Sequence, residues 1–300
     1  MRPKFYMLVG LPASGKSTYA KTLDGVIFSS DALRAEMWGN EATQGDNQVL
    51  LTELHKRIKD CLRNGQNAIY DATNINYKKR MAFLQELKHI DCEKICIFIA
   101  VPYEECLERN KQRDRVVPEY VIEKMYKSFN APYWYEGWDD IRVINEFENI
   151  YKVIDFIRIT QHFNQENHHH SLSLGEHCLK AFQIIRRNAK FNVWFEVTDF
   201  DIAALTHDNG KVFTKDFHNK KGEETEESHY YNHQYVGAYN SFFFNDIQDH
   251  LYVAQLIQWH MHPYVQWKDS EKAMVKDRML LGENLFNDIM ILHEADVKAH

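Results

Sequence analysis

A glycine-rich segment near the start of the chain has the residue types and spacing of a phosphate-binding loop. Residues 10–17, GLPASGKS, fit the pattern G-x-x-x-x-G-K-[ST] at every fixed position. In such a loop the glycines let backbone N–H groups wrap a phosphate, the lysine pairs with phosphate oxygens, and the hydroxyl binds Mg²⁺. The segment follows an apolar run and precedes a helix-like one, although a chance match in a turn is the alternative. We expect ATP or another nucleoside triphosphate, with Mg²⁺, to bind at Gly10, Gly15, Lys16 and Ser17.

Charged residues after the second strand-like run could complete a phosphotransferase site. Such an enzyme needs a carboxylate to accept the proton of the attacking hydroxyl, and cations to cover the transferred phosphoryl group. Asp31 follows the apolar run 26–29, and Arg34 lies one helical turn later. Asp31 could instead simply cap the helix expected at 31–38.

Two further segments could face the same cleft. Residues 71–74, DATN, follow the third strand-like run, at the carboxyl edge where open α/β sheets bind ligands. Asp71 could hold acceptor or metal, or it could cap the next helix. Residues 109–115, RNKQRDR, place four cations in seven positions and could close over phosphates as a lid, or form a solvated helix end.

The order and spacing of these motifs resemble the phage-type 5′-hydroxyl polynucleotide kinases. The resemblance covers about residues 5–130 and rests on GLPASGKST, DALR, DATN, VP, RNKQR, a second VP and KMYKS, at 10–18, 31–34, 71–74, 101–102, 109–113, 117–118 and 124–128. It implies that Asp31 is the general base on a polynucleotide 5′-hydroxyl, that Arg34 binds the acceptor's phosphate and that Arg113 clamps the donor. It also adds Thr18 to the nucleotide site, and it makes Asp71, Thr73, Asn74 and Arg109 candidate substrate-binding residues.

The second half of the chain concentrates histidines that could bind metal. Of 16 histidines, only His55 and His89 precede residue 151. The adjacent pair His207-Asp208 ends a helix-like segment, and both side chains are suited to divalent cations. Further candidates lie on separate helix-like segments, at His177, His233, His260 and Asp296.

This second arrangement resembles the HD superfamily of metal-dependent phosphohydrolases, whose pattern H…HD…D lies on an all-helical fold. The resemblance covers about residues 165–300. It implies that metal binds at His177, His207, Asp208 and Asp296, with His233 and His260 as extra ligands in a two-metal member, and that Lys211 contacts a substrate phosphate. One or two divalent transition metals are therefore expected. His168, His169 and His170 form either a polar loop or a substrate-phosphate site.

The elements that must position these residues differ between the halves. Strand-like runs at 5–9, 26–29, 67–70, 95–100 and 141–144 alternate with helix-period segments at 16–24, 31–38, 46–64, 77–89, 103–112 and 118–129, which is typical of a parallel sheet with crossover helices. Helix-period segments then follow at 176–189, 199–207, 229–243, 247–260 and 270–298, with an acidic loop at 223–227. We predict an α/β P-loop kinase domain at 1–155 and an all-α HD domain at 165–300, joined by the polar stretch 161–167.

The amino-acid composition limits the kinds of binding partner and the cellular compartment that we expect for the protein. The 300 residues carry a net charge of −7, which argues against a protein that coats duplex nucleic acid. The five cysteines show no C-x-x-C pair, so reduced thiols in a phage-encoded or bacterial cytosolic protein are expected. The chain opens on a strand-like run rather than a signal peptide, and no apolar run is long enough to span a bilayer.

Together, the two resemblances predict an enzyme that heals nucleic-acid ends, with RNA favoured over DNA. Ribonuclease cleavage leaves a 5′-hydroxyl and a 2′,3′-cyclic phosphate, which the kinase half and the HD half would convert for joining by a separate RNA ligase. Two alternatives remain open. The first is a small-molecule kinase, for a nucleoside or an antibiotic, with an HD half that acts on nucleotides. The second is an HD half that is catalytically inert and regulatory.

Overall fold

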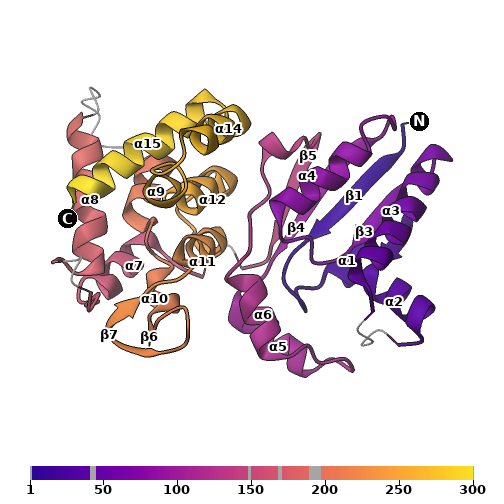
Figure 1. Ribbon diagram of the computed structural model, residues 1–300, viewed down its shortest axis with the longest axis horizontal. Coiled ribbons are helices and arrows are strands. Elements are labelled where there is room, and N and C mark those ends of the chain that lie inside the picture. The colour runs from indigo at the N-terminus through magenta and orange to yellow at the C-terminus, as the bar shows by residue number, and fades with distance from the viewer. Residues whose placement is uncertain (1, 41–44, 148–149, 168–170, 189–196, 300) are drawn as a thin grey trace. The chain divides into compact units, whose positions relative to one another are not determined.

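The computed structural model describes residues 2–40, 45–147, 150–167, 171–188 and 197–299 (Figure 1). Its contacts divide the chain into two compact units. The first comprises Met1–Met125 and Pro132–Glu146, and the second comprises Tyr126–Ala131 and Phe147–His300. The change from one unit to the other near residue 146 falls earlier than the expected domain end at 155.

The first unit is built on a five-stranded parallel sheet in the order β2-β3-β1-β4-β5. The strands are β1 (Lys4–Val9), β2 (Val26–Ser29), β3 (Ala68–Asp71), β4 (Glu93–Ala100) and β5 (Asp140–Asn145). The central strands β1, β3 and β4 are almost continuously apolar and buried, whereas edge strand β2 is half-exposed. Continuous apolar runs are what a sheet covered on both faces requires.

Helices connect the strands in the expected alternation. They are α1 (Lys16–Ala20), α2 (Ser30–Trp38), α3 (Asn47–Arg63), α4 (Tyr77–Glu86), α5 (Tyr103–Lys111) and α6 (Glu119–Tyr126), with a 3₁₀ turn, η1 (Trp134–Glu136), before β5. In α3 the apolar residues Leu50, Leu54, Ile58 and Cys61 recur at helical spacing and are buried. The parallel strands place their carboxyl ends at one edge, where β1, β2 and β3 lead into residues 10–17, 31 and 71.

The second unit is helical. Its helices are α7 (Val153–Thr160), α8 (Leu174–Asn188), α9 (Asp199–Thr206), α10 (Lys211–Thr214), α11 (His233–Asn240), α12 (His250–Trp259), α13 (His262–Val265), α14 (Glu271–Leu281) and α15 (Glu283–Lys298), and the 3₁₀ turn η2 spans Ser241–Phe243. Helix α9 is buried from Asp201 onward and α12 along most of its length. The two helices pack on each other, with α8 against α9 and α15, and α11 against α12.

Several local expectations for this unit were wrong. The acidic run does not form a loop: Glu224–His229 is strand β7, paired antiparallel with β6 (Asp216–His218). Helix α11 therefore starts at His233, after Asn232 in the left-handed region at φ 66°. The single helix expected at 270–298 is broken at Gly282, with φ 80°.

The polar stretch 161–167 is not a linker. Gln165 is buried, and its amide accepts a hydrogen bond from Lys211 Nζ at 2.9 Å. Helix α7, directly before it, was not predicted at all. Within this largely exposed stretch, Gln165 thus has a buried polar contact inside the second unit.

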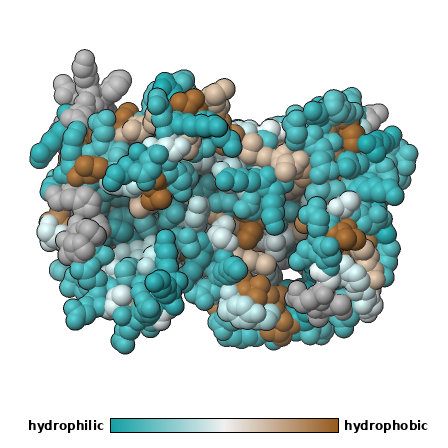
Figure 2. All heavy atoms as spheres, in the orientation of Figure 1, coloured by the Kyte–Doolittle hydropathy of each residue, from teal (hydrophilic) through white to brown (hydrophobic). Residues whose placement is uncertain are grey.

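The surface in Figure 2 is mostly hydrophilic on the face shown, with apolar residues scattered in small groups. Single exposed apolar side chains such as Met279 are normal for folded domains. Within the described residues, none of the helices is both long and apolar enough to cross a bilayer. All five cysteines are buried and free.

Candidate active sites

The phosphate-binding loop lies directly between β1 and α1, as its motif requires. Gly10 has φ 153° and Gly15 has φ 92°, backbone conformations that side-chain-bearing residues rarely adopt. A Cβ on Gly10 would also lie 2.8 Å from Ser14 Oγ and 2.9 Å from Ile99 O. Glycine at position 10 is therefore a steric necessity, and the strand, loop and helix place N–H groups where they can surround an anion.

Lys16 is buried at the base of this loop. Its Nζ donates to Leu11 O at 2.6 Å and lies 3.3 Å from Ser14 Oγ. Burial lowers the pKa of Lys16 to about 8, against the attraction of the Asp71 carboxylate. The ammonium is thus held among loop oxygens, ready to exchange them for phosphate oxygens.

The end of β3 supplies the groups suited to Mg²⁺. Ser17 Oγ donates to Asp71 Oδ2 at 2.6 Å, joining the motif's hydroxyl to the buried carboxylate. Gly10 N donates to Thr73 O at 3.1 Å, so the two loops are also tied through the backbone. The following helix is capped by Asn76, so Asp71 has no capping role there.

These groups line one cleft of about 740 Å³ in the first unit. Ten of the site residues predicted from the sequence line its walls: Gly15, Lys16, Ser17, Thr18, Asp31, Arg34, Asp71, Thr73, Arg109 and Arg113. The residue that caps α2 is Ser29, whose Oγ lies 3.4 Å from Ala32 N, so the alternative of Asp31 as the cap is wrong. Asp31 Oδ1 instead accepts from Arg34 Nη1 at 2.7 Å.

Arg109 and Asn74 stand apart from the other candidates. Arg109 lines the cleft, but its Nε is engaged by Glu105 on the same helix at 2.6 Å. Asn74 is absent from the cleft wall; its amide donates to Leu8 O at 2.9 Å and its φ is 48°. Asn74 therefore has a contact that shapes the loop after β3.

Sequence reasoning missed a buried ion pair behind this loop. Arg80 and Glu136 form a two-pronged contact, at 2.7 Å from Nε to Oε2 and 2.6 Å from Nη2 to Oε1, and both side chains are almost fully buried. Arg80 Nη1 also donates to Asn74 O at 2.8 Å. The two residues are 56 positions apart, so no local pattern could have identified them.

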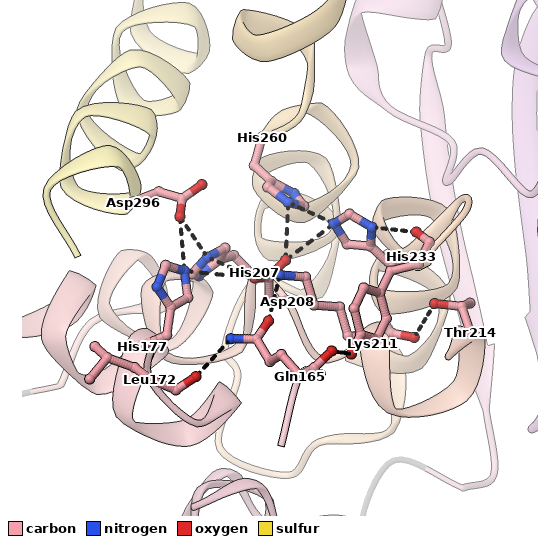
Figure 3. Close-up of polar contacts among 12 residues, drawn as sticks. Gln165, Leu172, His177, His207, Asp208, Lys211, Thr214, His233, His260 and Asp296 are labelled. Atoms are coloured by element: carbon pink, nitrogen blue, oxygen red, sulfur yellow. Dashed lines mark hydrogen bonds and ion pairs between the residues drawn. The ribbon is translucent and has the colours of Figure 1, made fainter. Parts of the chain in front are cut away.

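In the second unit, six candidate residues from separate helices converge on one point (Figure 3). They are His177 on α8, His207 and Asp208 after α9, His233 at the start of α11, His260 after α12 and Asp296 on α15, and all are buried. They form two groups of possible metal ligands: His177, His207 and Asp296, and then Asp208, His233 and His260. Within each group the ligand atoms lie within 4.8 Å of one another.

Asp208 lies between the two groups (Figure 3). Its Oδ2 is 3.7 Å from His177 Nε2 and 3.6 Å from His207 Nε2. Its Oδ1 is 3.2 Å from His233 Nε2 and 3.5 Å from His260 Nε2. One carboxylate thus offers one oxygen to each group.

Backbone carbonyls orient three of the histidines. The Nδ1 atoms of His207, His233 and His260 lie 2.9, 2.8 and 2.6 Å from the carbonyl oxygens of Ala204, Tyr230 and Ile257. A carbonyl can only accept, so Nδ1 of each ring carries a proton, and Nε2 is the atom that faces the other members of the site. This is the arrangement in which histidines bind metals.

The second site favours a cation. His233 Nε2 and His260 Nε2 are only 3.2 Å apart, so in neutral rings two lone pairs face each other beside a carboxylate. Burial works to lower the pKa of His207, but the Asp208 carboxylate and a hydrogen bond with Asp296 outweigh it and raise that pKa well above its ordinary value, so that this ring attracts a positive charge in the form of a proton or a metal ion. Burial also lowers the pKa of His260, keeping that ring neutral. The donor set therefore fits divalent metal.

Lys211 is, among the candidates that the structure describes, the cation next to the six ligands. Its Nζ lies 2.7 Å from Asp208 Oδ2 and is also held by Gln165 Oε1. The backbone oxygen of Gln165 accepts from the hydroxyls of Ser228 and Tyr230. Sequence reasoning missed Gln165, having placed it in a linker.

Tyr264 is a second residue that sequence reasoning missed. Its hydroxyl donates to Asp296 Oδ2 at 3.0 Å, which leaves Oδ1 facing His177 at 2.9 Å. A lone tyrosine on a short helix carries no signal of such a role. His168, His169 and His170 lie outside the described residues.

Comparison with known proteins adds to this geometry. Residues 5–132 match the profile of a family described as an AAA domain. The chain is 28% identical over 183 residues to an L-seryl-tRNA(Sec) kinase of Methanococcus maripaludis, covering 57% of this chain and 68% of that protein.

Two solved structures are also similar. One chain of the Pnkp1/Rnl/Hen1 RNA repair complex is 27% identical with a TM-score of 0.35, over 41% of this chain and 43% of that one. A putative kinase from Chloroflexus aurantiacus is 19% identical with a TM-score of 0.39, over 47% of this chain and 84% of that one. This chain thus spans less than half of the RNA repair protein that it matches.

The first unit has a phosphate-binding loop between β1 and α1, a five-stranded parallel sheet with flanking helices, and a matching family profile over 5–132. It has the fold of a P-loop kinase, and a helical unit follows it in the same chain.

Proposed function

We propose that the first unit transfers the γ-phosphate of ATP to the 5′-hydroxyl of a nucleic-acid end, with RNA as the natural acceptor. The observation that carries this proposal is that Asp31 and Arg34 line the same cleft as Lys16 and Ser17. A carboxylate and an arginine for the acceptor thus share one cavity with the groups for the donor.

The residues divide the reaction between them. Asp31 accepts the hydroxyl proton as the acceptor oxygen bonds to the γ-phosphorus and the bond to the leaving ADP oxygen breaks. Lys16 and Arg113 neutralise the charge of the transferred group, while Ser17 and Asp71 hold Mg²⁺. Arg34 holds a phosphate of the acceptor strand.

The relative from Methanococcus maripaludis supports an RNA-linked acceptor. Its printed name is L-seryl-tRNA(Sec) kinase, which describes a hydroxyl carried on RNA. The competing candidate is a kinase for a small free alcohol, such as a nucleoside or an antibiotic. Recognition of an end through a few arginines also agrees with the net charge of −7, because no long duplex has to be covered.

The decisive experiment offers both acceptor types with labelled ATP and Mg²⁺. A 5′-hydroxyl RNA oligonucleotide should become labelled, and Lys16→Ala and Asp31→Asn should abolish the label because they remove the phosphate contact and the base. Arg63→Ala is the control, since it removes an exposed cation paired with Asp60 outside the cleft. Labelling of nucleosides but not of any oligonucleotide would favour the small-molecule kinase.

We further propose that the second unit is an HD-type phosphohydrolase that removes 2′,3′-cyclic phosphate or 3′/2′-phosphate from the other RNA end. Divalent metal in this site would act as a Lewis acid and activate water. The six candidate ligands would hold the metal, and the Lys211 ammonium would bind a non-bridging phosphate oxygen. The buried Nε2 atoms of His233 and His260, which face each other beside the Asp208 carboxylate, support this proposal over an inert, regulatory unit.

Both activities in one chain would prepare broken RNA for a separate RNA ligase in the cytosol. The test of the second activity is release of phosphate from an RNA ending in 2′,3′-cyclic phosphate, with Mn²⁺, Zn²⁺, Ni²⁺ or Mg²⁺ supplied. Asp208→Asn should abolish it, whereas His218→Ala, on the exposed hairpin, should not. An active Asp208→Asn variant would contradict the assignment, and an inactive wild-type protein that binds no metal would favour the inert alternative.

A further inference from the structure

Asp31 is engaged by a second arginine, which lies in the cationic segment 109–115 and to which sequence reasoning gave no role of its own. Arg115 Nη1 lies 2.9 Å from Asp31 Oδ1, the same oxygen that accepts from Arg34 Nη1 at 2.7 Å. Arg115 belongs to the segment that follows α5, and all three side chains line the cleft. Two guanidinium groups therefore meet at one carboxylate oxygen.

The charges of this cluster are unbalanced in a way that favours a further anion. Two arginines and one carboxylate leave a net charge of +1, and each guanidinium has five N–H donors arranged in a planar fork. A phosphate group can accept two charge-assisted hydrogen bonds from each guanidinium group, whereas a single shared carboxylate oxygen cannot. At the same time, Asp31 Oδ1 faces both guanidinium groups, so a hydroxyl that approaches this oxygen competes with them.

Arg113 and Arg115, only two positions apart, have different surroundings. Arg113 lines the cleft and its charge contributes to lowering the pKa of Lys16, so it acts on the donor side. Arg115 contacts Asp31 and so acts on the acceptor side. One short segment after α5 thus carries a cation for each substrate.

We propose that Arg115 is a specificity-determining residue that binds, together with Arg34, a phosphate group next to the acceptor hydroxyl, and that without this phosphate it blocks Asp31. An acceptor carrying the phosphate draws the arginine away and frees the carboxylate for the hydroxyl proton. A nucleoside without a phosphate, or water, leaves Asp31 blocked. This inference rests on the proposed kinase function and adds to it a reason for selecting nucleotide ends and for suppressing ATP hydrolysis.

The test compares two acceptors that differ only in the neighbouring phosphate, a nucleoside and its 3′-monophosphate. Wild-type protein should prefer the 3′-monophosphate in kcat/KM. In Arg115→Ala the preference should shrink by about tenfold to a hundredfold, the contribution of hydrogen bonds to a charged group. Its acceptor-independent ATP hydrolysis should rise, because water then meets an unblocked Asp31. Arg115→Lys keeps the charge and loses the planar fork of donors. Its preference for the 3′-monophosphate should lie between that of wild-type protein and that of Arg115→Ala.

Two further measurements separate this role from a structural one. Arg113→Ala should raise KM for ATP and leave the acceptor preference intact, whereas Arg115→Ala should leave KM for ATP unchanged. Inorganic phosphate added with the nucleoside should increase turnover by wild-type protein and have no such effect on Arg115→Ala.

The possible outcomes are distinct. If Arg115→Ala lowers kcat/KM equally for both acceptors and ATP hydrolysis does not rise, the proposed role of Arg115 is wrong while the kinase assignment stands. If wild-type protein phosphorylates the two acceptors equally well, the role of Arg115 is again wrong. If wild-type protein transfers phosphate to neither acceptor nor to a 5′-hydroxyl oligonucleotide, the kinase function itself is wrong.

Discussion

At the scale of single residues, the second site depends on Asp208 more than on any other side chain. Each of its oxygens faces a different group of ligands, and burial, which would raise its pKa, is outweighed by Lys211 and His207, which hold that pKa well below its usual range. The carboxylate is therefore ionised and available to both groups. His233, in contrast, belongs to one group only.

This difference predicts how metal content responds to substitution. Protein loaded with divalent metal and freed of excess should retain two ions per chain. His233→Ala should lose one of them, and Asp208→Asn should weaken both because an amide oxygen carries no charge to share. Elemental analysis after dialysis measures this, with His218→Ala as the control. Equal losses in His233→Ala and Asp208→Asn would argue against a shared carboxylate.

Lys16 predicts a pH dependence for nucleotide binding. Because burial lowers its pKa to about 8, the side chain is charged below that pH and neutral above it in the free protein. Bound phosphates require the charged form, so binding at about pH 9 should take up close to one proton and affinity should fall as pH rises through about 8. Calorimetry in buffers of different ionisation enthalpy measures this uptake. Lys16→Arg, which stays charged, should take up none, and the absence of uptake in wild-type protein would refute the prediction.

At the scale of elements, the strands were easier to predict than the contacts that support the sites. The run 26–29 was predicted to the residue, because apolar residues between turn signals have few alternatives in a parallel sheet. The segment 270–298 was predicted as one helix because its helical periodicity continues on both sides of Gly282. In the structure, Gly282 separates two helices. The β6–β7 hairpin was missed because its acidic residues lack strand propensity and its pairing is non-local.

The predicted site residues came from motifs, and the missed ones came from packing. His177, His207, Asp208 and Asp296 fit a pattern that the chain carries in order, and the fold brings them together. Gln165, Tyr264, Arg80 and Arg115 act through partners far away in the sequence. Only the folded chain reveals such pairs.

The Arg80–Glu136 pair allows a prediction about how α4 is held against η1. Arg80→Met should leave Glu136 as an uncompensated buried charge and lower the free energy of unfolding by ~3–5 kcal/mol. Adding Glu136→Gln should recover much of this loss, because the amide oxygen still accepts from Trp138 Nε1. Urea unfolding monitored by fluorescence measures the change.

A matched pair at the surface provides the control. Arg57 makes a two-pronged contact with Glu36 that is exposed to water. Arg57→Met should change stability little, because water replaces the lost contact. If Arg57→Met and Arg80→Met lower the free energy of unfolding by the same amount, the contribution of the Arg80–Glu136 pair to stability does not depend on its burial.

At the scale of the whole molecule, the two proposed chemistries for phosphate lie in two compact units. The first binds phosphate with backbone N–H groups, Lys16 and arginines, and the second gathers buried histidines and carboxylates. The skew of histidines toward the second half follows from this division, although His218 and several others have no part in it. Among the described residues, the groups of each candidate site come from one unit, so substitutions in one site should leave the chemistry of the other intact.

The most direct test of this account follows both ends of one RNA that carries a 5′-hydroxyl and a 2′,3′-cyclic phosphate. With ATP and divalent metal, mass spectrometry should show wild-type protein adding a 5′-phosphate and leaving a 2′,3′-diol. The Lys16→Ala variant should still process the 3′ end but not the 5′ end, and the Asp208→Asn variant should still process the 5′ end but not the 3′ end. If wild-type protein leaves either end unchanged, or if either substitution abolishes both reactions in a folded protein, the assignment of two independent end-healing sites is contradicted.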